Sequence, residues 1–253
     1  MSEKRLLKAL NRIGLGDDAD VRRMASSLTW EVALAIEPEW EGRVPDKHFL
    51  GKVLGSNPNY TGWPVWLDSR SFTEAKSQPV IHDGAWEAII VSKGGWSSHL
   101  EFMRFDPRGK FYLRRALQDD QVPEKVAPGT ALDPIIVIIR VAEAIAVGIA
   151  IANGLMTTDD PPRQLGFAFR WTGLANRTLK TWANPFILMI GEPRAHDNTI
   201  STYVELPSDT PVSAIAPAVQ KATRDLFALF DGEIIPAHVI EDWSNRLIER
   251  RLR

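Results

Sequence analysis

Arginine and aromatic side chains concentrate in the middle third of the chain. Arg104, Arg114 and Arg170 lie in segments that also contain Tyr112 and Trp171. A guanidinium group presents a planar fork of donors that matches phosphate and carboxylate groups, and it stacks on aromatic rings. These five residues are therefore predicted to bind an anionic or nucleotide-like small molecule, or a protein partner. Surface ion pairs with neighbouring acidic residues are the structural alternative for the same arginines.

Histidine and carboxylate side chains form a second candidate group. His82 precedes one expected strand, His99 and Glu101 open the next, and Asp106 follows it. If those strands pair, imidazole and carboxylate groups converge and could hold a divalent metal or transfer protons. The alternative function is therefore a metal-dependent hydrolase or nuclease that uses these four residues. A polar sheet face and a turn explain the same residues without chemistry.

Two further groups have simple structural explanations beside the functional ones. Asp119 and Asp120 are adjacent carboxylates that could bind Mg²⁺, although a loop after a strand is often merely acidic. Trp63 and Trp66 lie in an irregular segment, where aromatic rings could close over a ligand. The same rings could instead fasten the segment to the core.

The motifs of the common catalytic classes are absent from the sequence. It has no glycine-rich loop followed by Lys-Ser or Lys-Thr, no dinucleotide-binding fingerprint, no HExxH and no GxSxG. The chain has no cysteine, which excludes disulfides, thiolate zinc sites, iron–sulfur clusters and cysteine nucleophiles. We therefore expect no catalytic residue and no metal ligand, favour a non-enzymatic role, and find no particular cofactor indicated.

The charge balance bears on partners and location. Lys and Arg number 30 against 32 Asp and Glu, which gives a formal charge of −2. Proteins that coat nucleic acid usually carry a basic excess, so the net charge gives a nucleic-acid partner no support. The first residues contain no apolar signal-peptide core, and we expect a cytoplasmic protein.

Hydrophobic periodicity predicts the elements that position these residues. The turn signal Asp106-Pro107-Arg108-Gly109 joins two strands into a hairpin. Strands joined by hairpins imply an antiparallel sheet, here of about five or six strands. The expected strands span 85–92, 99–105, 110–116, 164–171 and 178–182, with a second hairpin joining the last two. Residues 186–190 and 200–206 could add one or two more strands.

A long apolar helix is predicted to open at Asp133-Pro134 and to run to Leu155. Its apolar stretch is about long enough to span a bilayer. However, Arg140 and Glu143 are costly in lipid, and at a spacing of three residues they can pair on one face. We therefore predict a buried helix that covers the sheet, a ligand pocket between the two, and no membrane association.

Both ends of the chain are predicted to be helical. Residues 3–13 and 21–35 read as two helices, so that residues 1–40 form a helical hairpin arm. Residues 41–253 form an α+β sensor-like domain that ends in helices over 218–230 and from Pro236 onward. The N-terminal helices and the arginine-rich last helix could form the seam of a homodimer. The fold class is thus α+β, an antiparallel sheet covered by a long central helix with helical N- and C-terminal segments.

Three stretches of the sequence resemble a known group of proteins. The strings Tyr60-Thr61-Gly62-Trp63-Pro64, Asp83-Gly84-Ala85-Trp86-Glu87 and the run 104–120 resemble the region after the N-terminal domain in bacterial Schlafen–AlbA-type DNA-binding or ATP-binding proteins. The resemblance covers roughly residues 50–155 and implies a ligand-sensing or effector-coupling module of a bacterial regulatory or defence protein. No Schlafen–AlbA-type domain precedes residue 50, so neither DNA binding nor ATP binding nor any site residue is carried over.

Overall fold

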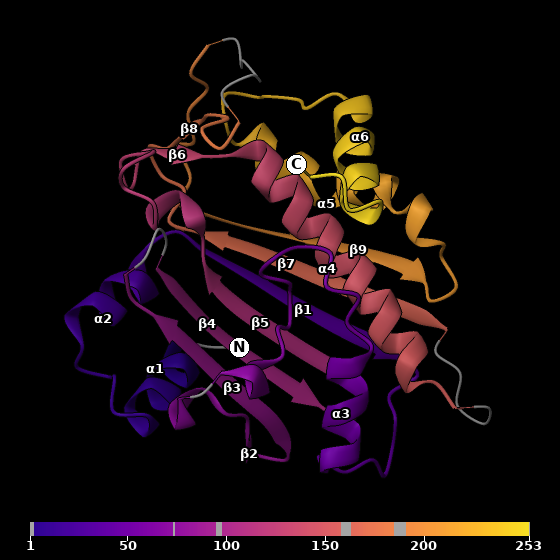
Figure 1. Cartoon of the computed structure of the whole chain (residues 1–253). Coiled ribbons are helices and arrows are strands. Elements are labelled where there is room, and N and C mark those ends of the chain that lie inside the picture. Colours follow the sequence, from indigo (N-terminus) through magenta and orange to yellow (C-terminus); the bar gives the residue numbers. More distant parts are fainter. Residues whose placement is uncertain (1–2, 73, 95–97, 158–162, 185–190, 253) are drawn as a thin grey trace.

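One antiparallel sheet with helices on both faces forms the body of the protein, as the computed structural model shows (Figure 1). The structure describes residues 3–72, 74–94, 98–157, 163–184 and 191–252. The strands follow the order β2-β3-β4-β5-β1-β7-β9, so the predicted α+β class is confirmed, with seven strands in place of five or six. The strands are β1 (Thr29–Glu37), β2 (Val80–His82), β3 (Ala85–Ser92), β4 (His99–Asp106), β5 (Lys110–Ala116), β7 (Gln164–Thr172) and β9 (Thr199–Pro207).

The interior strand β1 occupies residues that were expected to be helical. Helix α2 (Ala19–Ser26) ends well before Ala35, and β1 then pairs with β5 on one side and β7 on the other. The predicted helix over 21–35 is therefore wrong from residue 29 onward. Trp30 and Leu34 are buried members of an apolar series with a period of two. This period prevails over the helical stripe because β1 pairs with strands on both of its sides. The expected boundary near residue 40 thus falls after a strand from the interior of the sheet.

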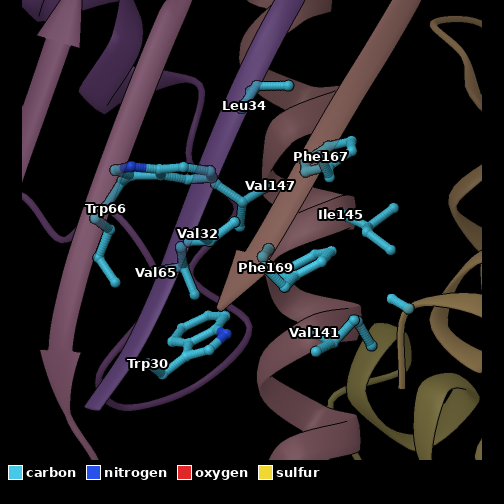
Figure 2. Packing of buried hydrophobic residues seen from close by; sticks show 14 of the residues in the cluster. Trp30, Val32, Leu34, Val65, Trp66, Val141, Ile145, Val147, Phe167 and Phe169 are labelled. Atoms are coloured by element: carbon cyan, nitrogen blue, oxygen red, sulfur yellow. The ribbon is translucent and has the colours of Figure 1, made fainter. Parts of the chain in front are cut away.

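The inner face of the sheet packs on helix α4 (Pro134–Leu155). Trp30, Phe167 and Phe169 meet Val141 and Ile145 of α4 in one continuous core (Figure 2). The helix is long and apolar enough to cross a membrane, yet 83% of its most apolar stretch is buried. The predicted buried central helix is confirmed. Helices α3 (Lys47–Gly55), α5 (Ala216–Ala228) and α6 (Ala237–Ile248) flank it.

The outer face is only partly covered by helices. Helix α1 (Glu3–Arg12) and α2 lay their apolar stripes on β3, β4 and β5. Leu6, Leu10, Val21 and Met24 are buried within the chain, so these side chains are not available to the predicted dimer seam of the N-terminal helices and the last helix. Beyond these helices, β1, β7 and β9 expose side chains such as that of Tyr203, which is 54% exposed.

The segment after β7 differs from the predicted second hairpin. Strand β7 pairs with β9, whereas the short β8 (Thr178–Leu179) pairs in parallel with β6 (Ala131–Leu132) in a separate sheet. The hairpin over 164–182 is therefore wrong. Arg177 binds Asp120 through both Nη atoms at 2.7 Å, and this ion pair holds the segment beside β6. The strand expected over 200–206 is confirmed as β9, and the one expected over 186–190 lies outside the described residues.

The close contact between α4 and the sheet depends on Gly148. A Cβ at this position would lie 2.5 Å from Cζ of Phe167 and 3.2 Å from Cδ2 of Leu34. Neither neighbour can move away easily, because both belong to the core. The absence of a side chain at Gly148 therefore sets how near the helix lies to the sheet.

We expect Gly148→Ala to lower the free energy of unfolding by about 1–3 kcal/mol, since overpacking outweighs the gain in helix propensity of about 1 kcal/mol. Gly51→Ala in α3 is the matched control, because no atom lies within 4 Å of its added Cβ. It should be neutral or stabilising. Urea unfolding of both variants checks this, and equal effects would contradict the role given to Gly148.

Candidate functional site

The three predicted arginines all lie on the outer face of the sheet. Arg104, Arg114 and Arg170 alternate along their strands with core residues that face α4. The expected pocket between the sheet and α4 is therefore wrong for these arginines. Trp171 is 1% exposed and faces the inner core, so the sheet separates it from the guanidinium groups.

Arg104 is occupied by structural contacts. Its Nη1 donates to Glu87 at 2.9 Å and to the carbonyl oxygen of His82 at 3.0 Å, and its Nη2 donates to the carbonyl oxygen of Asp83 at 2.8 Å. Arg5 of α1 donates to the same Glu87 carboxylate at 2.9 Å. This cluster fixes α1 on the sheet. A hollow of about 500 Å³ beside it is lined by Arg5, Arg12, Asp83 and Glu87, which form ion pairs with one another, and also by Lys4 and Lys8.

Arg114 and Arg170 flank Glu31 across three neighbouring strands. In the register of the sheet, Glu31 on β1 lies opposite Arg114 of β5 and Arg170 of β7. Nη1 of Arg114 is 3.7 Å from Glu31 Oε1. The hydroxyl of Tyr112 donates to Glu31 Oε2 at 2.7 Å. Burial and the adjacent carboxylate raise the pKa of Tyr112, so the phenol remains protonated and holds Glu31 in place.

These charged groups line a polar hollow of about 520 Å³ on the uncovered part of the outer face. Arg114 is anchored because its Nη2 donates to the carbonyl oxygen of Ala25 at 3.0 Å, while its Nε is buried without a partner. The side chain of Arg170 is exposed, and no hydrogen bond or ion pair engages its guanidinium group within the described part of the chain. Hydroxyl and amide groups complete the wall, from Ser26, Ser27, Thr172, Asn198 and Thr199.

The histidine and carboxylate group is not brought together. His99 and Asp106 lie at opposite ends of β4, and Glu101 shares the inner face with His99. His82 is on the edge strand β2. Over the described ranges, no cluster of three His, Asp or Glu side chains could hold a metal ion. The geometry therefore gives the hydrolase or nuclease alternative no common site.

Glu101 takes part in a buried ion-pair network instead. Its carboxylate contacts Nε of Arg115 at 2.7 Å and accepts a hydrogen bond from Nε1 of Trp63. The predicted pairing of Arg140 with Glu143 is confirmed at 3.0 Å. Arg140 also donates to the carbonyl oxygen of Trp63 at 2.8 Å. The two ion pairs thus fasten the tryptophan-containing segment to β4 and α4, as the structural explanation of this segment predicted.

His99 and Trp66 complete this clasp. The His99 ring stacks on Trp63 with centroids 4.1 Å apart, and burial lowers the pKa of His99, which favours the neutral imidazole. Trp66 is 1% exposed and lies in the main core. These rings are therefore packing groups rather than a cover over a ligand.

The two adjacent aspartates tie distant segments together. Asp120 binds Arg177 and accepts backbone N–H groups of Leu28 and Gly129, each at 2.8 Å. Oδ1 of Asp119 accepts the N–H of Asp133 at 2.7 Å and Nε1 of Trp182 at 2.9 Å. Burial raises the pKa of Asp119 to about 7. Three of their four oxygens therefore serve the fold, while Oδ2 of Asp119 is buried without a partner. No third acidic or histidine side chain joins them in a metal-binding cluster within the described residues.

Sequence reasoning missed Glu31 and the polar wall of the hollow. Glu31 was hidden because residues 21–35 had a helical stripe, and Thr172 and Asn198 were hidden by the wrongly expected hairpin. A usable signal existed in the alternation of apolar residues around Glu31. This alternation has a period of two, which places Glu31 on the face of the strand opposite the core.

Comparison with known proteins identified no relative: no family model, no curated protein and no solved structure matches this chain. The resemblance to the Schlafen–AlbA-associated region stays a prediction. The candidate site therefore depends on the geometry of the outer face.

The raised pKa of Asp119 predicts a dependence of stability on pH. The folded-state pKa of about 7 exceeds the ordinary aspartate pKa of 3.8, so this carboxyl stabilises the fold when protonated. The contribution of Asp119 to the free energy of unfolding is complete below about pH 4 and is lost as the pH rises through about 7. Asp119→Asn, which cannot ionise, should therefore gain stability relative to the wild type between pH 5 and pH 8, by a few kcal/mol.

Urea unfolding at several pH values measures this difference. Asp197→Asn, at an exposed position, is the matched control and should follow the wild-type profile. Parallel profiles for Asp119→Asn and the wild type would show that Asp119 does not titrate as described.

Proposed function

We propose that the protein is a non-catalytic ligand-sensing module that binds an anionic, nucleotide-like small molecule between Arg114 and Arg170. The observation that carries this proposal is the polar hollow of about 520 Å³ in which two guanidinium groups flank one carboxylate. It agrees with the role expected for these two arginines from the sequence. Arg104, Tyr112 and Trp171 act in the fold around the site rather than on the ligand.

The state of the two guanidinium groups supports anion binding. Arg114 is held by Ala25, so it loses little freedom when an anion binds, and its buried Nε lacks a partner. Arg170 is exposed beside it. A phosphate or carboxylate group between them would form charge-assisted hydrogen bonds with both.

Glu31 supports a ligand that carries donors as well as an anionic group. Its carboxylate would repel a bare anion but would accept hydrogen bonds from hydroxyl or amino groups. The hydroxyls of Ser26, Thr172 and Thr199 add donors and acceptors to the wall. A nucleotide combines a phosphate with such donors and complements this set of groups.

Binding, rather than reaction, matches the chemistry of the wall. Guanidinium, hydroxyl and amide groups hold anions without further activation. A hydroxyl nucleophile would require an adjacent base to activate it. Glu31 is engaged with Tyr112 and faces Arg114. The proposal therefore assigns no reaction to this hollow.

Calorimetric titration and thermal shift with inorganic phosphate and with nucleoside mono- and triphosphates test the proposal. We expect a nucleotide to bind and to stabilise the wild type. Arg170→Ala should weaken that binding about 10- to 100-fold, the equivalent of one charge-assisted hydrogen bond of about 1.5–3 kcal/mol.

Arg224→Ala is the matched control, because this exposed arginine lies on α5, which packs on the inner face. It should bind the nucleotide like the wild type. Absence of binding across these probes, or equal affinity in Arg170→Ala, would refute the assignment of the hollow.

A further inference from the structure

The two edge strands of the sheet differ in length. The edge at β2 is a strand of three residues, a length that offers little for another chain to pair with. The edge at β9 is nine residues long and regular. Among the described residues, no strand pairs with the outer side of β9. An unprotected edge of this length is a template for another strand.

The hydrogen-bond pattern shows which groups of β9 point outward. Ser208 N donates to Arg163 O at 3.2 Å, and Gly173 N donates to Asn198 O at 3.0 Å, in the same register as the β7–β9 pairs. In an antiparallel ladder, such pairs recur at every second residue, so the even-numbered residues of β9 bond to β7. The outward N–H and C=O groups belong to Thr199, Ser201, Tyr203 and Glu205.

The same residues also present their side chains to the uncovered outer face. Ser201, Tyr203 and Glu205 are exposed, whereas Thr202 and Val204 are buried beneath α5. A strand added at this edge would therefore gain both the free backbone groups and the exposed side chains, without disturbing the core.

We propose that β9 pairs in antiparallel fashion with β9 of a second copy of the chain, with the two-fold axis at Tyr203. Each Tyr203 then faces the partner subunit's Tyr203, and Ser201 faces the partner subunit's Glu205. The two sheets become one continuous sheet across the dimer. This seam differs from the helical seam that the sequence allows for a homodimer.

The backbone of β9 is self-complementary in this register. Ser201, Tyr203 and Glu205 each have an outward N–H and C=O, and each finds both partners on the second strand. Pro207 has no N–H, but it falls at the end of the paired stretch, where proline is tolerated. Registers shifted along the strand leave more of these groups unpaired.

The side chains are complementary in charge. Glu205 is the single charged residue of β9, and this register places it opposite a small serine rather than opposite another carboxylate. Behind Ser201 in the same row lies Arg170 of β7. The partner subunit's Glu205 therefore approaches an exposed guanidinium, and no like charges face each other.

Cross-linking tests the register directly, because the chain has no cysteine. Two residues paired across the axis have Cα atoms about 5.5 Å apart, within the range of a disulfide. Mildly oxidised Tyr203→Cys should therefore run as a covalent dimer on a non-reducing gel. Glu205→Cys is the matched control: two residues 205 would lie about 14 Å apart and should not cross-link.

Sedimentation tests the pairing without cysteine. The wild type should dimerise as concentration rises. Ser201→Pro removes one outward N–H and should weaken dimerisation at least 10-fold, while Ser201→Ala should not. Neither residue 201 nor residue 203 lines the hollow, so ligand binding and dimerisation can fail independently. A wild type that stays monomeric, or a Glu205→Cys chain that cross-links as readily as Tyr203→Cys, would overturn the proposal.

Discussion

The contact of α4 with the sheet at Gly148 determines where polar chemistry can occur in this protein. Without a Cβ at Gly148, the helix approaches Phe167 and Leu34 so closely that apolar side chains fill the space between α4 and this part of the sheet (Figure 2). Close-packed interiors have no room for a ligand of useful size. The free polar groups of the strands therefore face the opposite side, where α1 and α2 cover only part of the sheet.

The charged groups that remain inside serve the assembly of the fold. Glu101 with Arg115 and Arg140 with Glu143 are buried beneath the tryptophan-containing segment. Removing such charges from water is costly unless each is paired and hydrogen-bonded. Here Trp63 supplies hydrogen bonds to both ion pairs, and the irregular segment is thereby held across the sheet and α4. Asp119 and Asp120 likewise connect distant segments, because their carboxyl groups accept hydrogen bonds from residues 28, 129, 133 and 177.

Both proposed properties, ligand binding and subunit pairing, belong to the uncovered part of the outer face. The hollow between Arg114 and Arg170 lies beside the last strands of the sheet, and β9 is the edge strand there among the residues that the structure describes. Arg170 lies in the strand next to β9, opposite Glu31 of β1 on one side and Ser201 of β9 on the other. A ligand that engages Arg170 would therefore alter the charge that the second copy meets. Ligand binding and subunit pairing are adjacent on one surface and can be measured separately.

The sequence alone determined the antiparallel sheet, the hairpin at Pro107, the buried helix from Pro134 and the pairing of Arg140 with Glu143. These features depend on turn chemistry and on spacings within a few residues. Only the tertiary structure decided that residues 29–37 form a strand between β5 and β7, and that Glu31 therefore lies between Arg114 and Arg170. The stripe around β1 satisfies periods of both two and 3.6, and pairing with β5 and β7 selects the strand. Local periodicity shows which residues share a face, whereas the helices that cover each face come from distant parts of the chain.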